Sequence, residues 1–280
     1  METVESVAEM RAVAARLRAK KGGLSLISTM GALHAGHEAL LSAAWSAGGP
    51  VVVSIFANPL SFGANEDFAG YPRTPEADLA LCARHGVAAV FAPSVAEIYP
   101  KGFSTYVTEE HVSKPLCGIS RPTHFRGVAT FATKLLNIVG PSRLFVGQKD
   151  AQHVAVLRKL AADLNYDVEF VVVPTVREPD GLAAAVRNAE MTPGLRQEAL
   201  AIGKSLRQVK EMVESGVLST DRLVAEATHI LGQHHRVRVI YASIVDRLTM
   251  EPVREVVPDK TLLCIAAWLD EVRLIDNVVL

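Results

Sequence analysis

The chain alternates between short apolar runs and longer segments whose apolar residues recur at helical spacing. A short apolar run bounded by turns is typical of a strand buried on both faces, whereas a 3.6-residue period is typical of a helix. In chain order, the first half predicts strands at 24–27, 50–56, 87–91, 143–146 and 168–173. It predicts helices at 4–20, 38–45, 74–85, 127–139 and 151–165. Strands that alternate with helices indicate a parallel sheet covered on both faces.

The pattern changes after Pro174. A loop is expected from 175 to about 188, and the remaining elements are expected to be helices at 193–216 and 221–233 and strands at 237–245 and 260–268. Helices followed by strands favour a small α+β domain. We therefore predict two domains, one over residues 1–175 and a smaller one over residues 176–280.

The composition of the chain limits the kinds of molecule that it is expected to bind and where it is expected to act. The chain has 280 residues, 49% of them hydrophobic, and a formal net charge of −1, which favours neither nucleic acid nor an anionic membrane. No apolar run approaches the length of a membrane span, and the first residues lack the basic start and apolar core of a signal peptide. The three cysteines are far apart and show neither metal spacing nor a disulfide framework. The cysteine usage therefore predicts a cytoplasmic protein.

The most informative segment, residues 28–37, lies between the first predicted strand and the helix after it and reads Ser-Thr-Met-Gly-Ala-Leu-His-Ala-Gly-His. A glycine-containing turn at this place presents backbone N–H groups and the positive end of a helix dipole, which suits a phosphate. His34 and His37 can add two further donors. If ATP binds here, these groups stabilise the charge that grows on its phosphates during attack at the α-phosphorus. Two ordinary surface histidines on a turn are the alternative, which the flanking strand and helix disfavour.

Two other polar segments, 57–63 and 147–150, also follow predicted strands. Ligands of an open parallel sheet bind beyond the carboxyl ends of its strands, so we expect both segments near the histidine turn. Lys149 is a point charge suited to a polyphosphate. Asp150 is suited to accepting from ribose hydroxyls or to capping the next helix. The second domain could cover the crevice that these segments line.

Three further groups of charges are less specific. Arg187 follows a Pro-Asp-Gly turn and lies on a loop from which it could reach phosphates; an ordinary charged linker is the alternative. The basic segment 121–127 either contacts an anion or simply begins a helix. The acid pairs Glu109–Glu110 and Glu66–Asp67 are most simply solvated loop charges, although one could hold magnesium.

Taken together, these motifs resemble those of the pantothenate synthetase family, also called pantoate–β-alanine ligases. The likeness follows the family's order through nearly the whole chain. It is carried by residues 29–37, 54–59, 71–74, 121–128, 147–152, 174–183, 187–188 and 273–277.

The resemblance implies a Rossmann-like parallel-sheet domain of the adenylyltransferase superfamily, followed by a smaller C-terminal lid, usually as a homodimer. It also implies ATP and Mg²⁺ and a reaction in two steps. A carboxylate, pantoate in the family, attacks the α-phosphorus to give an acyl adenylate and pyrophosphate. An amine, β-alanine in the family, then attacks the acyl carbon and releases AMP.

The resemblance also assigns roles to residues. The implied catalytic residues are His34, His37 (the acid-like group), Lys149 and Arg187. The implied ATP-binding residues are Met30, Gly31, His34, His37, Gly147, Lys149, Asp150, Val176 and Arg187. The acid or amine substrate is expected at Asn58, Ser61, Gln152 and His153. The resemblance assigns no metal ligand.

The chain departs from the family pattern at substrate positions. Ser61 and His153 stand where the family has substrate-contacting glutamines, and Ala185 and Val186 replace paired serines before Arg187. Losing one matched hydrogen bond in a closed site costs about 1–3 kcal/mol, so two losses should weaken pantoate binding unless the pocket is rebuilt.

Three alternatives to pantothenate synthesis therefore stay open. The first is an amide ligase of this type with a different acid or amine. The second is a nucleotidyltransferase that stops at a nucleotide-linked product, which segment 174–188 and the second domain disfavour. The third is a non-catalytic binding protein; Ala185 and Val186 favour it, whereas the intact histidines, Lys149 and Arg187 oppose it.

Overall fold

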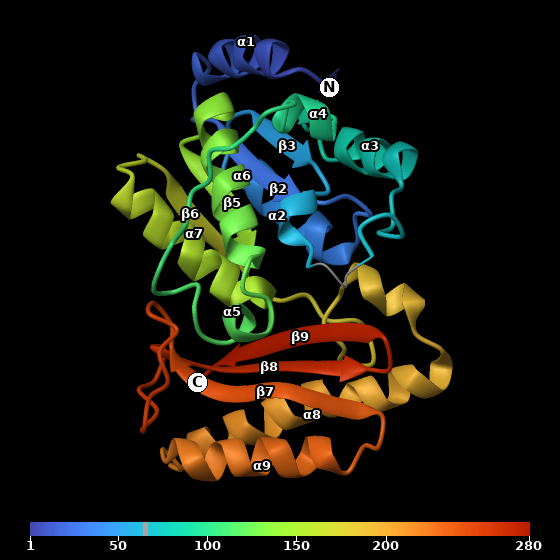
Figure 1. Cartoon of the computed structure of the whole chain (residues 1–280), viewed down its shortest axis with the longest axis vertical. Helices are drawn as coiled ribbons and strands as arrows, with labels where there is room; N and C mark the ends of the chain where they lie inside the picture. Colours follow the sequence, from blue (N-terminus) through green and yellow to red (C-terminus); the bar gives the residue numbers. More distant parts are fainter. Residues whose placement is uncertain (64–66) are drawn as a thin grey trace. The chain divides into compact units, whose positions relative to one another are not determined.

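The computed structural model describes residues 1–63 and 67–280 and divides into two compact units (Figure 1). The first comprises Met1–Glu110, Arg121–Gly147 and Val156–Val173, and the second comprises His111–Ser120, Gln148–Ala155 and Pro174–Leu280. Two short segments from before residue 156 thus pack with the C-terminal part. The predicted domain limits at 175 and 176 stay a prediction, and Glu66 lies outside the described residues.

The first unit contains the predicted parallel sheet, which is confirmed. Its strand order is β1-β4-β3-β2-β5-β6, with every described pair parallel. The strands are β1 (Glu2–Val4), β2 (Ser25–Thr29), β3 (Val51–Ile55), β4 (Ala89–Phe91), β5 (Arg143–Gly147) and β6 (Glu169–Val173). The chain moves outward in one direction from β2 to β3 and in the other from β5 to β6. The boundary between β2 and β5 is therefore the topological switch point, where such sheets bind ligands.

Helices cover this sheet on both faces. They are α1 (Val7–Arg18), α2 (Ala35–Ser46), α3 (Pro75–Arg84), α4 (Val95–Ile98), α6 (His124–Val139) and α7 (Ala151–Asp163), of which α7 begins in the second unit. Right-handed crossovers place α2 and α3 on one face and α6 and α7 on the other. The packing agrees, because Leu41 of α2 and Leu81 of α3 share a core with Ile27 and Phe145 of the sheet. On the other side α1 packs against α6.

One predicted element needs correction. The helix expected at 4–20 begins only at Val7, because the Ser6 side chain accepts a hydrogen bond from the Glu9 N–H and caps it. The residues before it, Glu2–Val4, form the edge strand β1 beside β4. Three residues are too few for a visible alternation, which is why the sequence pattern missed this strand.

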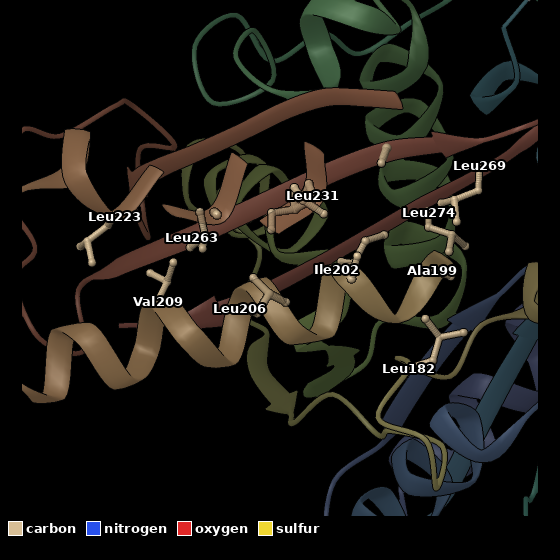
Figure 2. Packing of buried hydrophobic residues seen from close by; sticks show 14 of the residues in the cluster. Leu182, Ala199, Ile202, Leu206, Val209, Leu223, Leu231, Leu263, Leu269 and Leu274 are labelled. Atoms are coloured by element: carbon tan, nitrogen blue, oxygen red, sulfur yellow. The ribbon is translucent and has the colours of Figure 1, made fainter. Parts of the chain in front are cut away.

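The second unit is the predicted α+β assembly. Helices α8 (Pro193–Glu214) and α9 (Thr220–Gly232) precede an antiparallel sheet of β7 (Val237–Asp246), β8 (Thr261–Leu269) and β9 (Val272–Val279) in the order β7-β8-β9. Both helices lie along one face of this sheet (Figure 1). Ile202 and Leu206 of α8 meet Leu263, Leu269 and Leu274 of the sheet (Figure 2).

The opposite face of this sheet carries the segments 111–120 and 148–155. Segment 111–120 contains α5 (Cys117–Ser120), whose Cys117 Sγ lies 3.1 Å from the Tyr241 hydroxyl of β7. Arg273 of β9 donates to the same sulfur at 3.3 Å. Because both faces are covered, β8 is buried almost throughout, which explains its continuously apolar sequence. Among the described residues, no helix is long and apolar enough to cross a membrane.

Candidate active site

A buried carboxylate, that of Asp78, binds the backbone of the turn that follows β2. Gly31 has φ of 91° and is followed by Ala32 at φ 51°, so two successive residues adopt left-handed backbone. The Asp78 carboxylate of α3 accepts from the N–H groups of Ala32 at 2.9 Å and Leu33 at 2.8 Å. Asp78 is only 2% exposed. Sequence reasoning missed it, although an acid on the buried face of an apolar helix was a visible signal.

The two histidines cap helix α2 reciprocally. His34 is the N-cap, and its Nδ1 accepts from the Gly36 N–H at 3.1 Å. His37 Nδ1 accepts from the His34 N–H at 3.1 Å, and the two ring centres are 4.2 Å apart. Gly36 is needed between them, because a Cβ there would lie 2.9 Å from the His34 ring. With Nδ1 accepting, the neutral ring carries its proton on Nε2, so each imidazole has an N–H donor on its far edge.

The three polar segments that we expected to lie near one another come at the ends of neighbouring strands. β2 pairs with β3 on one side and β5 on the other, and the segments that begin at 28, 57 and 147 follow these three strands. Met30 is 38% exposed at the end of β2. Gly147 ends β5, and a Cβ built there would meet no atom within 4 Å. The histidine turn and Gly147 therefore lie at the carboxyl ends of β2 and β5, the two strands that flank the switch point.

Asn58 organises the segment after β3. Its Nδ2 donates to the Ser61 hydroxyl at 2.8 Å and to the Gly127 carbonyl at 3.0 Å. Its Oδ1 accepts from the Leu60 N–H at 3.1 Å and from the Tyr99 hydroxyl at 2.9 Å. Burial raises the pKa of Tyr99, so its hydroxyl is protonated and donates. Asn58 thus uses its amide within the protein, and the predicted substrate contact stays a prediction.

Ser61 is buried at the end of the short helix η1 (Pro59–Ser61), which packs on α6. Its carbonyl lies 2.9 Å from the Arg121 guanidinium and 2.7 Å from His124 Nδ1. The basic segment 121–127 therefore binds the backbone at the predicted acid position. Gly127 permits this approach, because a Cβ there would lie 2.1 Å from the Leu60 carbonyl oxygen.

In the second unit, Lys149 and Asp150 lie on the helix η2 (Gln148–Asp150). The Lys149 side chain is 22% exposed, and its Nζ lies 4.0 Å from Asp150 Oδ1. The turn is attached to β9 through Asn277, whose Nδ2 donates to the carbonyls of Gln148 at 3.0 Å and Lys149 at 2.9 Å. Asn277 had no predicted role in the site.

Gln152 and His153 follow on the first turn of α7. Gln152 is buried; its Oε1 accepts from the Cys117 N–H at 3.0 Å, and its Nε2 donates to the carbonyls of Val112 and Pro115. A direct substrate contact of Gln152 stays a prediction, because these bonds show only that it holds segment 111–120. Burial lowers the pKa of His153, against a smaller opposing effect of the Asp150 carboxylate, so its imidazole is neutral near pH 7.

The loop before α8 carries Val176 and Arg187. The Val176 carbonyl accepts from the Ala184 N–H at 2.9 Å. Arg187 lies on η3 (Val186–Glu190) and forms a half-exposed pair with Glu190 at 3.4 Å. Lys149 and this loop line one hollow of the second unit, together with Ala185 and Asn188.

Asn188 presents a buried polar atom in that hollow. Its Nδ2 donates to Glu178 and to the Ala183 carbonyl, whereas its buried Oδ1 has no hydrogen-bond partner among the described residues. A buried acceptor without a donor costs about 1–3 kcal/mol. A ligand hydroxyl or amino group that reached this oxygen would recover that cost. Asn188 was part of the family motif but had no predicted contact.

A protein-only metal cage is absent from the described part of the chain. Residues 1–63 and 67–280 contain no group of three or more His, Cys, Asp or Glu side chains that could hold a metal ion. Mg²⁺ that accompanies a nucleotide is usually bound through phosphate oxygens, water and one or two carboxylates.

The first unit places the fold in the class of doubly wound, Rossmann-like α/β proteins, here with an appended α+β unit. The family model for pantoate-β-alanine ligase matches residues 2–279. The pantothenate synthetase of Thermotoga neapolitana is 46% identical over 280 residues, with all of both chains covered. That of Geobacter sulfurreducens is 44% identical, with 100% of this chain and 99% of its own covered. The chain belongs to the pantoate–β-alanine ligase family.

Comparison with solved structures supports the same family. The structure of pantothenate synthetase from Thermus thermophilus matches with a TM-score of 0.93 and 39% identity and covers 99% of both chains. A pantoate-β-alanine ligase from Francisella tularensis, complexed with β-γ ATP and β-alanine, matches with a TM-score of 0.79 and 28% identity. That match covers 100% of this chain and 97% of the Francisella chain. The family resemblance seen in the sequence is thus confirmed over the full length.

Proposed function

We propose that this protein joins pantoate to β-alanine at the expense of ATP, through an enzyme-bound acyl adenylate. The observation that carries this proposal is the full-length family match at up to 46% identity. The structure supports it with a reciprocally capped histidine turn at the switch point of the first unit. In the second unit, Lys149 and the loop of Arg187 line one hollow.

In the first step, a carboxylate oxygen attacks the α-phosphorus, and the bond from that phosphorus to the bridging oxygen breaks, releasing pyrophosphate. Negative charge grows on the phosphate oxygens as this happens. We assign the Nε2–H groups of His34 and His37 to donate to those oxygens, since each Nδ1 already accepts from backbone. Lys149 and Arg187 supply the positive charges. Gly147, Asp150 and Val176 are assigned to the nucleoside part.

In the second step, the amine attacks the acyl carbon, its proton is lost, and AMP leaves. Met30 and Gly31 are assigned to the nucleotide beside the histidines, and the segment that contains Asn58 and Ser61 to the acid. Mg²⁺, when bound with the nucleotide, would supply positive charge that offsets the charge of the leaving pyrophosphate. The homodimer and the cytoplasmic location stay predictions, and sedimentation velocity tests the first.

A second candidate is a ligase of the same mechanism with a different acid or amine. It is favoured by the substrate positions. Ser61 is short and buried with its hydroxyl bonded to Asn58, and His153 is a half-buried imidazole whose pKa is lowered by desolvation. The resemblance expects an amide at both places. A smaller hydroxyl leaves room where the amide would lie, so this candidate differs in the shape of the acid pocket.

The test is pyrophosphate release from ATP with a panel of small carboxylic acids, each with and without β-alanine or another amine. Rapid release with pantoate, and AMP formation that requires β-alanine, support the main proposal. Faster release with another acid supports the second candidate. In that case Ser61→Gln with His153→Gln should raise kcat/KM for pantoate by about tenfold or more. Release without any amine-linked product indicates a nucleotidyltransferase, and no release with any acid indicates a binding protein.

A further inference from the structure

Two neighbouring residues of β9, Asp276 and Asn277, belong to a family-like motif that the proposed chemistry leaves without a role. They lie opposite Ile265 and Cys264 of β8. Consecutive residues of a strand point to opposite faces of the sheet, so the two side chains leave β9 in opposite directions. Each residue is only 5% exposed. A buried carboxylate and a buried amide both need polar partners, and these partners define what the pair does.

Asn277 binds the lysine turn, residues 148–150. Its Nδ2 donates to the carbonyls of Gln148 at 3.0 Å and Lys149 at 2.9 Å. Its Oδ1 accepts from Gln148 Nε2 at 2.8 Å. One amide group therefore fixes both the backbone on which Lys149 stands and the side chain before it.

Asp276 binds the arginine loop, residues 176–188, from the other face of β9. Its two oxygens accept from the Arg177 guanidinium at 2.7 and 3.2 Å. The carboxylate is 4% exposed and Arg177 is 32% exposed, so the ion pair is largely screened from water on the acid side. A two-pronged pair of this kind restricts orientation as well as distance. Arg177 also donates to the Gly181 carbonyl at 3.2 Å, which extends the restraint into the loop.

The restraint continues to Arg187 through a second set of bonds. Arg196 of α8 pairs with Glu178 at 2.5 Å and with Asp180 at 2.7 Å. Glu178 in turn accepts from Asn188 Nδ2 at 2.5 Å, and Asn188 is the neighbour of Arg187. Lys149, Asn188 and Asp276 line the same hollow. The lysine turn and the arginine loop are thus joined through two adjacent residues of one strand.

We propose that Asp276 and Asn277 are positioning residues that set the distance between Lys149 and Arg187 across the phosphates. This inference rests on the proposed function, because it takes those two cations as phosphate ligands. Both residues are assigned an indirect role, through the two segments that they hold. A displacement of about 1 Å in such a pair is enough to lower a rate by about 100-fold. The effect belongs to adenylation, in which phosphate charge grows, and not to the attack of the amine.

The kinetic test separates the two half-reactions in Asp276→Asn and Asn277→Ala. Pyrophosphate release in a single turnover should fall by about 10- to 100-fold in each variant. The rate at which added, preformed acyl adenylate reacts with β-alanine should change less than about threefold. Asp270→Asn is the control, since it alters an exposed Arg236–Asp270 pair in the turns beside the same sheet, outside the proposed site, and it should keep both rates. Equal losses in both half-reactions, or no loss, would overturn the proposal.

Double variants test which segment each residue serves. In the Asn277→Ala background, Lys149→Ala should slow adenylation less than it does in the wild type, because the lysine is already misplaced. Arg187→Ala should behave in the same way in the Asp276→Asn background. Fully additive losses in both cycles would contradict the assignment of residues to segments.

Amide hydrogen exchange tests the positioning role independently of the proposed function, because it measures how firmly the two segments are held whether or not the protein is active. Asn277→Ala should speed amide exchange in the lysine turn by about tenfold, and Asp276→Asn should do the same in the arginine loop. Asp270→Asn should leave the exchange rates of both segments unchanged. If the wild type releases no pyrophosphate with pantoate, the proposed function fails, and exchange still decides whether the two segments are held by β9. Unchanged exchange in both variants would overturn the positioning role whatever the activity.

Discussion

The imidazoles of His34 and His37 cap α2 and have a proposed second role as phosphate donors, and mutation can separate the two. Their Nδ1 atoms accept backbone N–H groups at the start of α2, and their far edges face away from those bonds. A capping interaction of this kind contributes about 0.5–2 kcal/mol to stability. An alanine substitution at either position therefore removes both the helix cap and the proposed phosphate contact, so a loss of activity alone does not show which one matters.

His37 variants resolve the two contributions. We expect His37→Ala to lower Tm by about 2–4 °C and to slow adenylation by about 100-fold. Glutamate and glutamine are the usual residues at this capping position, so His37→Glu and His37→Gln should recover most of the Tm. His37→Glu should still fail in adenylation, because its carboxylate repels the phosphates. Thermal melting and single-turnover pyrophosphate release measure the two effects, and wild-type rates in His37→Glu would remove the histidine from the mechanism.

His153 gives the protein a pH dependence with a definite sign. Burial lowers the pKa of its imidazole below the ordinary 6.5, so below about pH 6.5 the unfolded chain binds a proton that the folded chain does not. Stability is then lost as pH falls, by at most about 1.4 kcal/mol per pH unit. His153→Gln should weaken this loss between pH 7 and pH 5 in urea titrations. His229→Gln, at an exposed position of α9, should keep the wild-type profile, and an unchanged profile in His153→Gln would contradict the argument.

At the scale of elements, the sequence predicted most of the long strands and helices, but it missed the eight-residue strand β9 (Val272–Val279) and several short elements. Buried strands such as Val51–Ile55 and long amphipathic helices such as Pro193–Glu214 differ from their predicted ranges by at most two residues at either end. β1 was missed because three residues carry no period. The histidine turn was found because its residue types are chemically specific. Asp78, Asp276 and Asn277 had no assigned role because their partners lie far away in the sequence.

The close packing of α6 on η1 depends on Gly127. A Cβ at this position would lie 2.1 Å from the Leu60 carbonyl oxygen and 2.8 Å from the Ser61 nitrogen. We expect Gly127→Ala to cost about 1–3 kcal/mol in urea unfolding and to raise the KM of the acid substrate, because the segment around Ser61 must move. Gly194→Ala, in the first turn of α8 where a Cβ meets no atom within 4 Å, should be neutral or slightly stabilising. A Gly127→Ala variant with wild-type stability would show that the helix can shift without cost.

At the scale of the whole molecule, neither unit is one continuous stretch of the sequence. Segment 111–120 and residues 148–155 pack with the C-terminal part although they lie between strands of the first unit. Their bonds include those of Cys117 to Tyr241 and Arg273 and those of Asn277 to the lysine turn. A cut at a sequence-based boundary therefore leaves buried polar groups without partners.

A fragment of residues 1–173 tests this organisation. We expect it to unfold at a lower urea concentration than the full chain and to exchange amides rapidly in 111–120 and 148–155, since the sheet that covers these segments is missing. Circular dichroism and hydrogen exchange measure both properties. Protection of the two segments equal to that in the full chain would show that they do not need the second unit.

The bonds from Asn277 to the lysine turn span 128 and 129 positions of the chain. A ribosome adding about 5–20 residues per second therefore takes at least several seconds between making Lys149 and making the strand that holds it. During that interval the lysine turn exists without its anchor. The nascent chain therefore contains the proposed phosphate-binding lysine before the strand that positions it has been made. Under the proposed function, ATP affinity is expected to arise late in synthesis.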